Sequence, residues 1–80
     1  MRTTLTKFNN NANDAHTIIV ELVEFSRGAY EVRKIYKYSN AKDKTIPITS
    51  TPNVYHAKIF YGKEVDSVKC DGYITESKED

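Results

Sequence analysis

The 80-residue sequence is poor in cysteine and glycine, and each shortage excludes a class of site. Cys70 is the single cysteine, which excludes an intramolecular disulfide and a zinc site built from paired cysteines. The glycines Gly28, Gly62 and Gly72 are isolated, so the chain has no glycine-rich loop that would cradle a phosphate. A chain this short must therefore hold its fold by packing alone or with a partner subunit.

Long hydrophobic runs are also missing. The longest stretch, Ile18 to Val20, is ended by Glu21, whereas a membrane-spanning helix needs roughly 20 apolar residues. Residues 1–8 lack the continuous apolar core of a signal peptide. We therefore expect a cytoplasmic location without membrane contact.

Residues with catalytic or metal-binding chemistry are few and scattered. His16 and His56 are the only histidines, and neither belongs to a cluster with metal-ligand spacing. Activation of the Cys70 thiol would need a neighbouring cation or base that the sequence does not identify, so this residue is interpreted as a half-buried filler. We therefore predict that the protein is not an enzyme and that it has no catalytic residue, no metal site and no cofactor.

Charge is unevenly distributed, although the net charge is only +1. Residues 29–44 contain five cations against two carboxylates, a net charge of +3, and residues 64–80 contain six carboxylates against two cations, a net charge of −4. Opposed patches of this kind attract different partners, or attract each other in a homodimer. The alternative is that both patches are simply solvated.

Two polar stretches divide what we predict to be a single small domain over residues 1–75. Residues 9–14 are rich in Asn and Asp, and residues 39–53 combine Ser and Thr with Pro47 and Pro52, so both stretches are expected to be loops. Residues 76–80 are predicted to be a flexible acidic tail. The remaining segments are strand-like: residues 3–8, 17–26, 29–38, 53–61, 65–70 and 73–75.

Residues 17–38 are predicted to form one β-hairpin that turns at Arg27-Gly28. The first half is dense in β-branched residues, which pack well on a sheet, and the second half alternates from Tyr30 to Tyr38. A helix over residues 15–27, capped by Asp14, is the alternative, because apolar residues also recur there at helical spacing. The hairpin is favoured because folding it brings apolar, aromatic or oppositely charged residues opposite each other.

The hairpin has two possible registers. A two-residue turn pairs Val23 with Val32 but requires Arg27 at positive φ, which is uncommon for that residue type. A three-residue loop with Gly28 in the left-handed conformation instead pairs Leu22 with Val32 and shifts all pairs by one. Side-chain pairing favours the first register, and turn chemistry favours the second.

The predicted fold class is mainly β. We expect a small antiparallel sheet or barrel of four to six strands with a central hairpin, residues 17–26 and 29–38. The alternative is an α+β fold with a helix at residues 15–27.

Cations and tyrosines interleave along the second strand of the hairpin and continue into the loop after it. Tyrosine suits protein interfaces, and lysines beside strand-borne aromatic rings can also bind single-stranded nucleic acid. We therefore predict a partner-binding set composed of Tyr30, Arg33, Lys34, Tyr36, Lys37, Tyr38, Lys42 and Lys44. The predicted partner is another protein or a protein–nucleic acid complex.

In size, polar loops and lack of a catalytic motif, the chain resembles compact accessory proteins of bacteriophages and mobile elements, a likeness that rests on no shared motif. Such proteins often inhibit a larger host machine by covering one of its surfaces. The expected function is thus a non-enzymatic protein-binding module that inhibits a nucleic-acid-handling host complex. The alternative is a small β domain that binds single-stranded nucleic acid directly.

Overall fold

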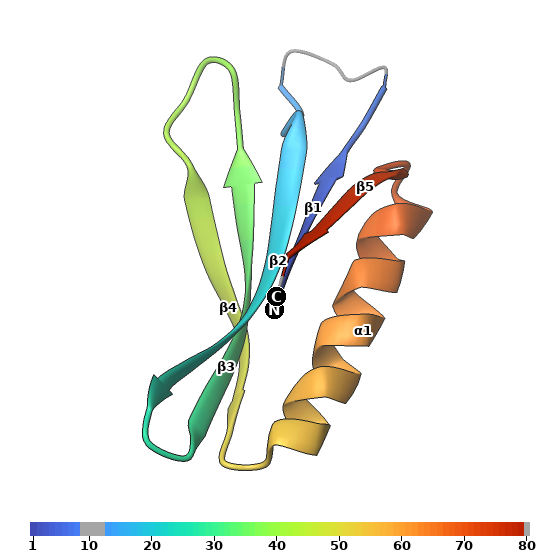
Figure 1. Cartoon of the computed structure of the whole chain (residues 1–80). Helices are drawn as coiled ribbons and strands as arrows, with labels where there is room; N and C mark the ends of the chain where they lie inside the picture. Colours follow the sequence, from blue (N-terminus) through green and yellow to red (C-terminus); the bar gives the residue numbers. More distant parts are fainter. Residues whose placement is uncertain (9–12, 80) are drawn as a thin grey trace.

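A computed structural model describes residues 1–8 and 13–79 of the chain. Within these residues, five strands and one helix follow one another as β1 (Arg2–Thr6), β2 (Thr17–Ser26), β3 (Ala29–Lys37), β4 (Lys44–Thr51), α1 (Val54–Cys70) and β5 (Thr75–Glu79) (Figure 1). Residues 9–12 of the predicted first loop lie outside the described residues.

The strands form one antiparallel sheet in the order β4-β3-β2-β1-β5. β1 to β4 follow one another as neighbours, and α1 then connects the β4 edge to the β5 edge. The helix must therefore cross one face of the sheet, as Figure 1 shows. The mainly β prediction with a central hairpin is confirmed, and the sheet is open instead of closed into a barrel.

The central hairpin of β2 and β3 combines features of both predicted registers. Ser26 pairs with Ala29 across Arg27-Gly28, and Gly28 adopts a φ of +73°. A β-bulge between Glu24 and Ser26 then inserts one residue, so Leu22 faces Val32 along the rest of the ladder. Most of the hairpin thus follows the register that turn chemistry favours, and the helix alternative for residues 15–27 is wrong.

The helix α1 corrects the predicted strands at residues 53–61 and 65–70. Asn53 caps it, because its side chain accepts hydrogen bonds from the backbone amides of Tyr55 (2.9 Å) and His56 (3.2 Å). The residues buried against the sheet recur at helical spacing: Ala57, Tyr61, Val65 and Val68. The alternation of apolar residues over 55–61 is therefore incidental, and tertiary burial decides the structure of this segment.

Strand β4 corrects the predicted loop at residues 39–53. Residues 39–43 and 52–53 of this range lie outside strands and helices, whereas residues 44–51 form β4 and pair with β3. Proline lacks a backbone donor, yet Pro47 fits here because β4 is an edge strand with one side unpaired. A register shift opposite Val32 and Arg33 further distorts this edge.

Strand β5 corrects the predicted flexible tail over residues 76–79, and residue 80 of that prediction lies outside the described residues. Residues 75–79 pair with β1 over their whole length, from Thr75 opposite Thr6 to Glu79 opposite Arg2. Tyr73, predicted to begin a short last strand, is instead buried, with 6% of its surface exposed. The first strand likewise spans residues 2–6 in place of the predicted 3–8.

The core lies between α1 and the sheet face that the helix covers. Leu5, Val20 and Val32 from the sheet meet Ala57 and Val68 from the helix, and all are almost completely buried. The Thr3 hydroxyl is hydrogen-bonded to the Tyr61 hydroxyl within this layer. Within the described part of the chain, α1 is too short and too polar to cross a membrane.

Candidate partner-binding surface

The structure divides the eight predicted partner-binding residues between the two faces of the sheet. Val32 is buried beneath α1, so the alternation of β3 places Lys34 and Tyr36 on the same, helix-covered side. Arg33 and Lys37 point to the opposite, open face. The structure therefore does not bring the whole predicted set together.

Four of these residues and one neighbour form a continuous surface on the helix side of β3 and β4. Lys44 lies opposite Tyr36 in the strand register, and Ile46 lies opposite Lys34. The half-buried rings of Tyr36 and Tyr38 stack with their centroids 6.5 Å apart, and both pack against the core. We call this group the tyrosine–lysine surface: Lys34, Tyr36, Tyr38, Lys44 and Ile46. Tyr30 also packs against the core, at the far end of β3.

Lys34 anchors this surface to the helix. Its ammonium lies 3.4 Å from the Glu64 carboxylate of α1 and 5.6 Å from the centre of the Tyr36 ring. Burial lowers the pKa of Lys34, but attraction to Tyr36 and Glu64 outweighs burial and raises this pKa above 10.5. Lys34 is therefore charged, and its charge is neutralised within the fold.

Lys42 and Lys44 differ from Lys34 because both are exposed to solvent. Lys42 lies in the loop between β3 and β4, and Lys44 begins β4. In the described part of the chain, no carboxylate lies within salt-bridge distance of either ammonium, whereas Lys37 binds Asp43 of the same loop at 3.0 Å. Lys42 and Lys44 thus provide positive charge that the fold leaves available.

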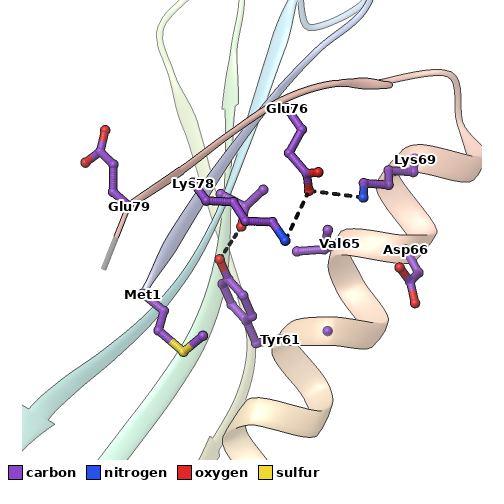
Figure 2. Close-up of a pocket in the computed structure, with 10 residues that line it drawn as sticks. Met1, Tyr61, Val65, Asp66, Lys69, Glu76, Lys78 and Glu79 are labelled. Carbon is purple, nitrogen blue, oxygen red and sulfur yellow. Dashed lines mark hydrogen bonds and ion pairs between the residues drawn. The ribbon is translucent and has the colours of Figure 1, made fainter.

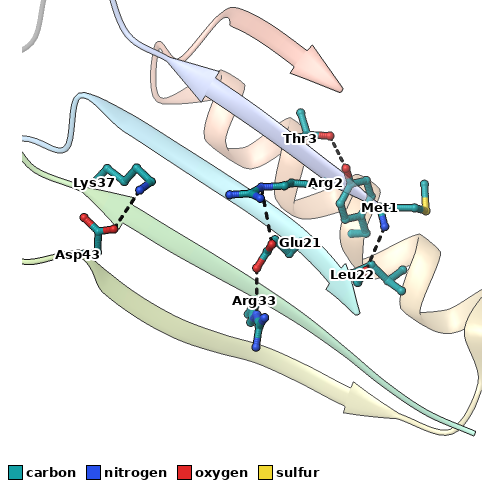
Figure 3. A network of polar contacts seen from close by, with 9 residues as sticks. Met1, Arg2, Thr3, Glu21, Leu22, Arg33, Lys37 and Asp43 are labelled. Carbon is teal, nitrogen blue, oxygen red and sulfur yellow. Dashed lines mark hydrogen bonds and ion pairs between the residues drawn. The ribbon is translucent and has the colours of Figure 1, made fainter. Parts of the chain in front are cut away.

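The open face carries a separate ionic network, which Figure 3 shows. The Arg33 guanidinium donates a hydrogen bond to Glu21 at 3.1 Å and approaches Glu31 at 3.6 Å, and Arg2 lies 3.7 Å from Glu21. Glu21 is central, because it pairs directly with Arg2 on β1 and with Arg33 on β3. The predicted role of Arg33 in partner binding therefore competes with a cross-strand role inside the sheet.

Tyr73 supports the tyrosine–lysine surface from the end of the helix. Its hydroxyl donates a hydrogen bond of 2.6 Å to the Ala15 carbonyl, and Lys7 lies 5.4 Å above its ring. Burial, followed by the charge of Asp14 and the neighbouring Tyr38 and Tyr36, raises the pKa of Tyr73 above 10.0. Nearby Tyr36 and Tyr38 are thus backed by a third, fixed tyrosine.

Sequence reasoning missed Ile46, Glu64 and Tyr73 as parts of this site. Pro47 made the segment around Ile46 resemble a loop. Glu64 lies in a helix that was not predicted, because the apolar residues before it alternate as in a strand. The spacing of Ala57, Tyr61 and Val65, together with the cap Asn53, was the available sign of that helix.

The titratable groups outside this surface are dispersed. The Nδ1 atom of His16 lies 2.8 Å from the Thr17 hydroxyl, His56 is exposed, and the free thiol of Cys70 is exposed and not half-buried as expected. Among residues 1–8 and 13–79, no three His, Cys, Asp or Glu side chains are grouped closely enough to hold a metal ion.

Comparison with models of known protein families, with curated proteins and with solved structures found no match.

Proposed function

We propose that the protein is a non-enzymatic binding module whose partner is another protein, contacted through the tyrosine–lysine surface. The observation that supports this most is the combination of a stacked tyrosine pair with an adjacent cation that has no carboxylate partner in the described part of the chain. Lys44 lies opposite Tyr36 and is exposed, whereas Lys34 is held by Glu64. The complementary partner surface is acidic and carries an apolar side chain.

Tyrosines at this position suit a protein interface for a physical reason. Tyr36 and Tyr38 are half-buried and packed on the core, so little side-chain freedom remains to be lost on binding. Rigid aromatic residues of this kind are common among the residues that contribute most binding energy. Lys42 and Lys44 at the rim would accelerate association with an acidic surface.

We further propose that binding blocks the partner, as expected from the sequence. The described residues form one helix and one open sheet, and covering a surface on a larger molecule is the mode of action that we propose for them. The proposed target is an acidic surface of a nucleic-acid-handling assembly, and occlusion of that surface is the proposed mechanism.

Direct binding of single-stranded nucleic acid is the second candidate, because tyrosines and lysines share one surface. The geometry favours it less. Tyr36 already has Lys34 and Tyr38 beside its ring, and Arg33 and Lys37 are paired on the other face. A fluorescent oligonucleotide titrated at low and high salt separates the two: direct binding would weaken steeply with salt, and absence of binding at low salt excludes it.

The protein-binding proposal is tested by affinity capture with matched variants, followed by mass spectrometry. Lys44→Glu reverses a charge within the tyrosine–lysine surface, and Lys37→Glu makes the same change on the open face. We expect a captured protein that Lys37→Glu retains and that Lys44→Glu and Tyr36→Ala lose. Equal retention by all variants would contradict the proposed surface.

A further inference from the structure

The outward side of α1 carries apolar residues that the fold does not bury. Tyr55 is 73% exposed and Ile59 is 55% exposed, one helical turn apart. Gly62 follows on the same side, and Lys58 and Asp66 lie four residues before and after it, also exposed. We call this side the α1 ridge: Tyr55, Lys58, Ile59, Gly62 and Asp66.

Gly62 is not required by the monomer. It lies in the middle of α1 without a positive φ. Apart from its chain neighbours and the helix backbone, a Cβ added there would meet no atom of the described residues within 4 Å. Glycine inside a helix costs about 1 kcal/mol relative to alanine. What glycine offers at an exposed position is close approach of another backbone.

The charges of the α1 ridge are arranged symmetrically about Gly62. In two antiparallel helices related by a two-fold axis at Gly62, residue 58 of one copy meets residue 66 of the other. Lys58 then faces Asp66 of the second copy, and the same pair forms again on the other side of the axis. The ridge is therefore complementary to itself in charge.

In the same antiparallel arrangement of two copies, an apolar side chain of the second copy enters a cavity beside the α1 ridge. The cavity has a volume of about 250 Å³ and lies between α1 and the β1–β5 edge (Figure 2). Met1, Tyr61, Gly62 and Val65 line one part of it, and polar or charged side chains line the rest: Thr3, Asp66, Lys69, Glu76, Lys78 and Glu79. The antiparallel register places Ile59 of the second copy opposite Val65. Glu76, bound to Lys69 at 3.0 Å, lines the polar end of the cavity.

We propose that the protein forms a homodimer in which α1 packs antiparallel against α1 of a second copy, crossing at Gly62. Ile59 of each copy fills the cavity of the other, and the two Lys58–Asp66 pairs fix the register. A contact built on one helix from each copy lies at the small end of specific interfaces, so the dimer depends on concentration. The proposal does not rest on the tyrosine–lysine surface, which lies on β3 and β4.

Sedimentation velocity over roughly 10 μM to 1 mM protein tests the dimer, because small interfaces bind in this range. We expect wild type to shift from monomer to dimer as concentration rises. Lys58→Asp should weaken the dimer roughly ten-fold, because each dimer loses two ion pairs and gains like-charge contacts. Combining Lys58→Asp with Asp66→Lys should restore it, and Arg27→Asp, at the exposed turn between β2 and β3, is the matched control.

Gly62→Ala supplies a second test that misfolding cannot imitate. It should raise the thermal midpoint of the monomer, since helix propensity improves, and at the same time weaken the dimer. A wild type that stays monomeric at the highest concentration would overturn the proposal. A charge-swapped double variant that does not dimerise, or an Arg27→Asp effect equal to that of Lys58→Asp, would overturn it as well.

Discussion

At the scale of single residues, Lys34 and Lys44 show how surroundings separate two similar side chains. Both lie on the helix side of the sheet, on neighbouring strands. The Lys34 side chain is only 16% exposed and binds Glu64, whereas Lys44 is exposed and has no such partner among the described residues. Lys34 therefore contributes to the fold, and Lys44 is available for binding.

Tyr73 is the residue whose hydroxyl has the clearest structural role. Tyr73→Phe removes its hydrogen bond to Ala15, and we expect the free energy of unfolding at pH 7 to fall by about 1–2 kcal/mol. Tyr55→Phe is the matched control, because that hydroxyl belongs to a side chain that is 73% exposed. Urea denaturation of both variants gives the comparison, and equal stability of the two would contradict the role of Tyr73.

The raised pKa of Tyr73 also predicts a pH dependence. The fold favours the neutral hydroxyl, so the stability that it contributes is fully present below pH 10.0 and is lost as pH rises through the raised pKa. Lys34, whose pKa is raised above 10.5, acts in the same direction at higher pH. Alkaline denaturation should therefore be less steep in Tyr73→Phe than in wild type, and an unchanged slope would contradict this assignment.

At the scale of elements, the start of α1 depends on one side chain. Asn53→Ala removes the acceptor for two backbone amides, and we expect the free energy of unfolding to fall by about 1 kcal/mol. Asn40→Ala, in the exposed loop between β3 and β4, makes the same change away from a helix and should leave stability unchanged. Thermal denaturation followed by circular dichroism measures both, and similar midpoints would argue against the cap.

The contribution of β5 is testable by truncation. A chain ending at Ile74 loses the strand that pairs with β1 and the Glu76 partner of Lys69, so we expect at least about 2 kcal/mol of lost stability. Glu79→Gln keeps the strand and removes one charge, which makes it the control. A truncated chain as stable as the full one would instead support a flexible tail.

A helix or strand was predictable from the sequence when the interactions that decide its structure lie close together along the chain. The hairpin was predictable because pairing and turn chemistry both lie within residues 17–38. The helix was not, since Tyr55, Ala57 and Ile59 alternate as in a strand. The burial that decides its structure comes from the sheet, chiefly from β2 together with β3 and β4. The position of Pro47 on an edge strand, and the pairing of residues 75–79 with β1, likewise depend on the order of strands in the sheet.

The candidate site was partly predictable for the same reason. The interleaving of lysines and tyrosines predicted Lys34, Tyr36 and Tyr38 on one strand, and the structure places Lys34 and Tyr36 on β3 and Tyr38 directly after its end. Strand register then separated Arg33 and Lys37 from them, and two elements that were assigned wrongly contributed Ile46 and Glu64.

At the scale of the whole molecule, the two proposed surfaces bind different partners: the α1 ridge binds a second copy, and the tyrosine–lysine surface binds another protein. α1 covers one face of the sheet with its inward side and offers the α1 ridge outward, while β3 and β4 present the tyrosine–lysine surface. A dimer through α1 would therefore carry two copies of the partner site. Avidity toward a repeated or dimeric partner would follow from that arrangement.

The most direct test of the partner site is the affinity of the captured partner for matched charge variants, measured by titration calorimetry. Because Lys44 is exposed and has no carboxylate partner among the described residues, we expect Lys44→Glu to weaken binding by roughly ten-fold or more, as expected for reversal of a charge that faces an acidic surface. Lys37→Glu should bind within about two-fold of wild type, because a change outside the contact has little effect on affinity. Equal affinities for the two variants, or a greater loss from Lys37→Glu, would contradict the assignment of the tyrosine–lysine surface as the binding site.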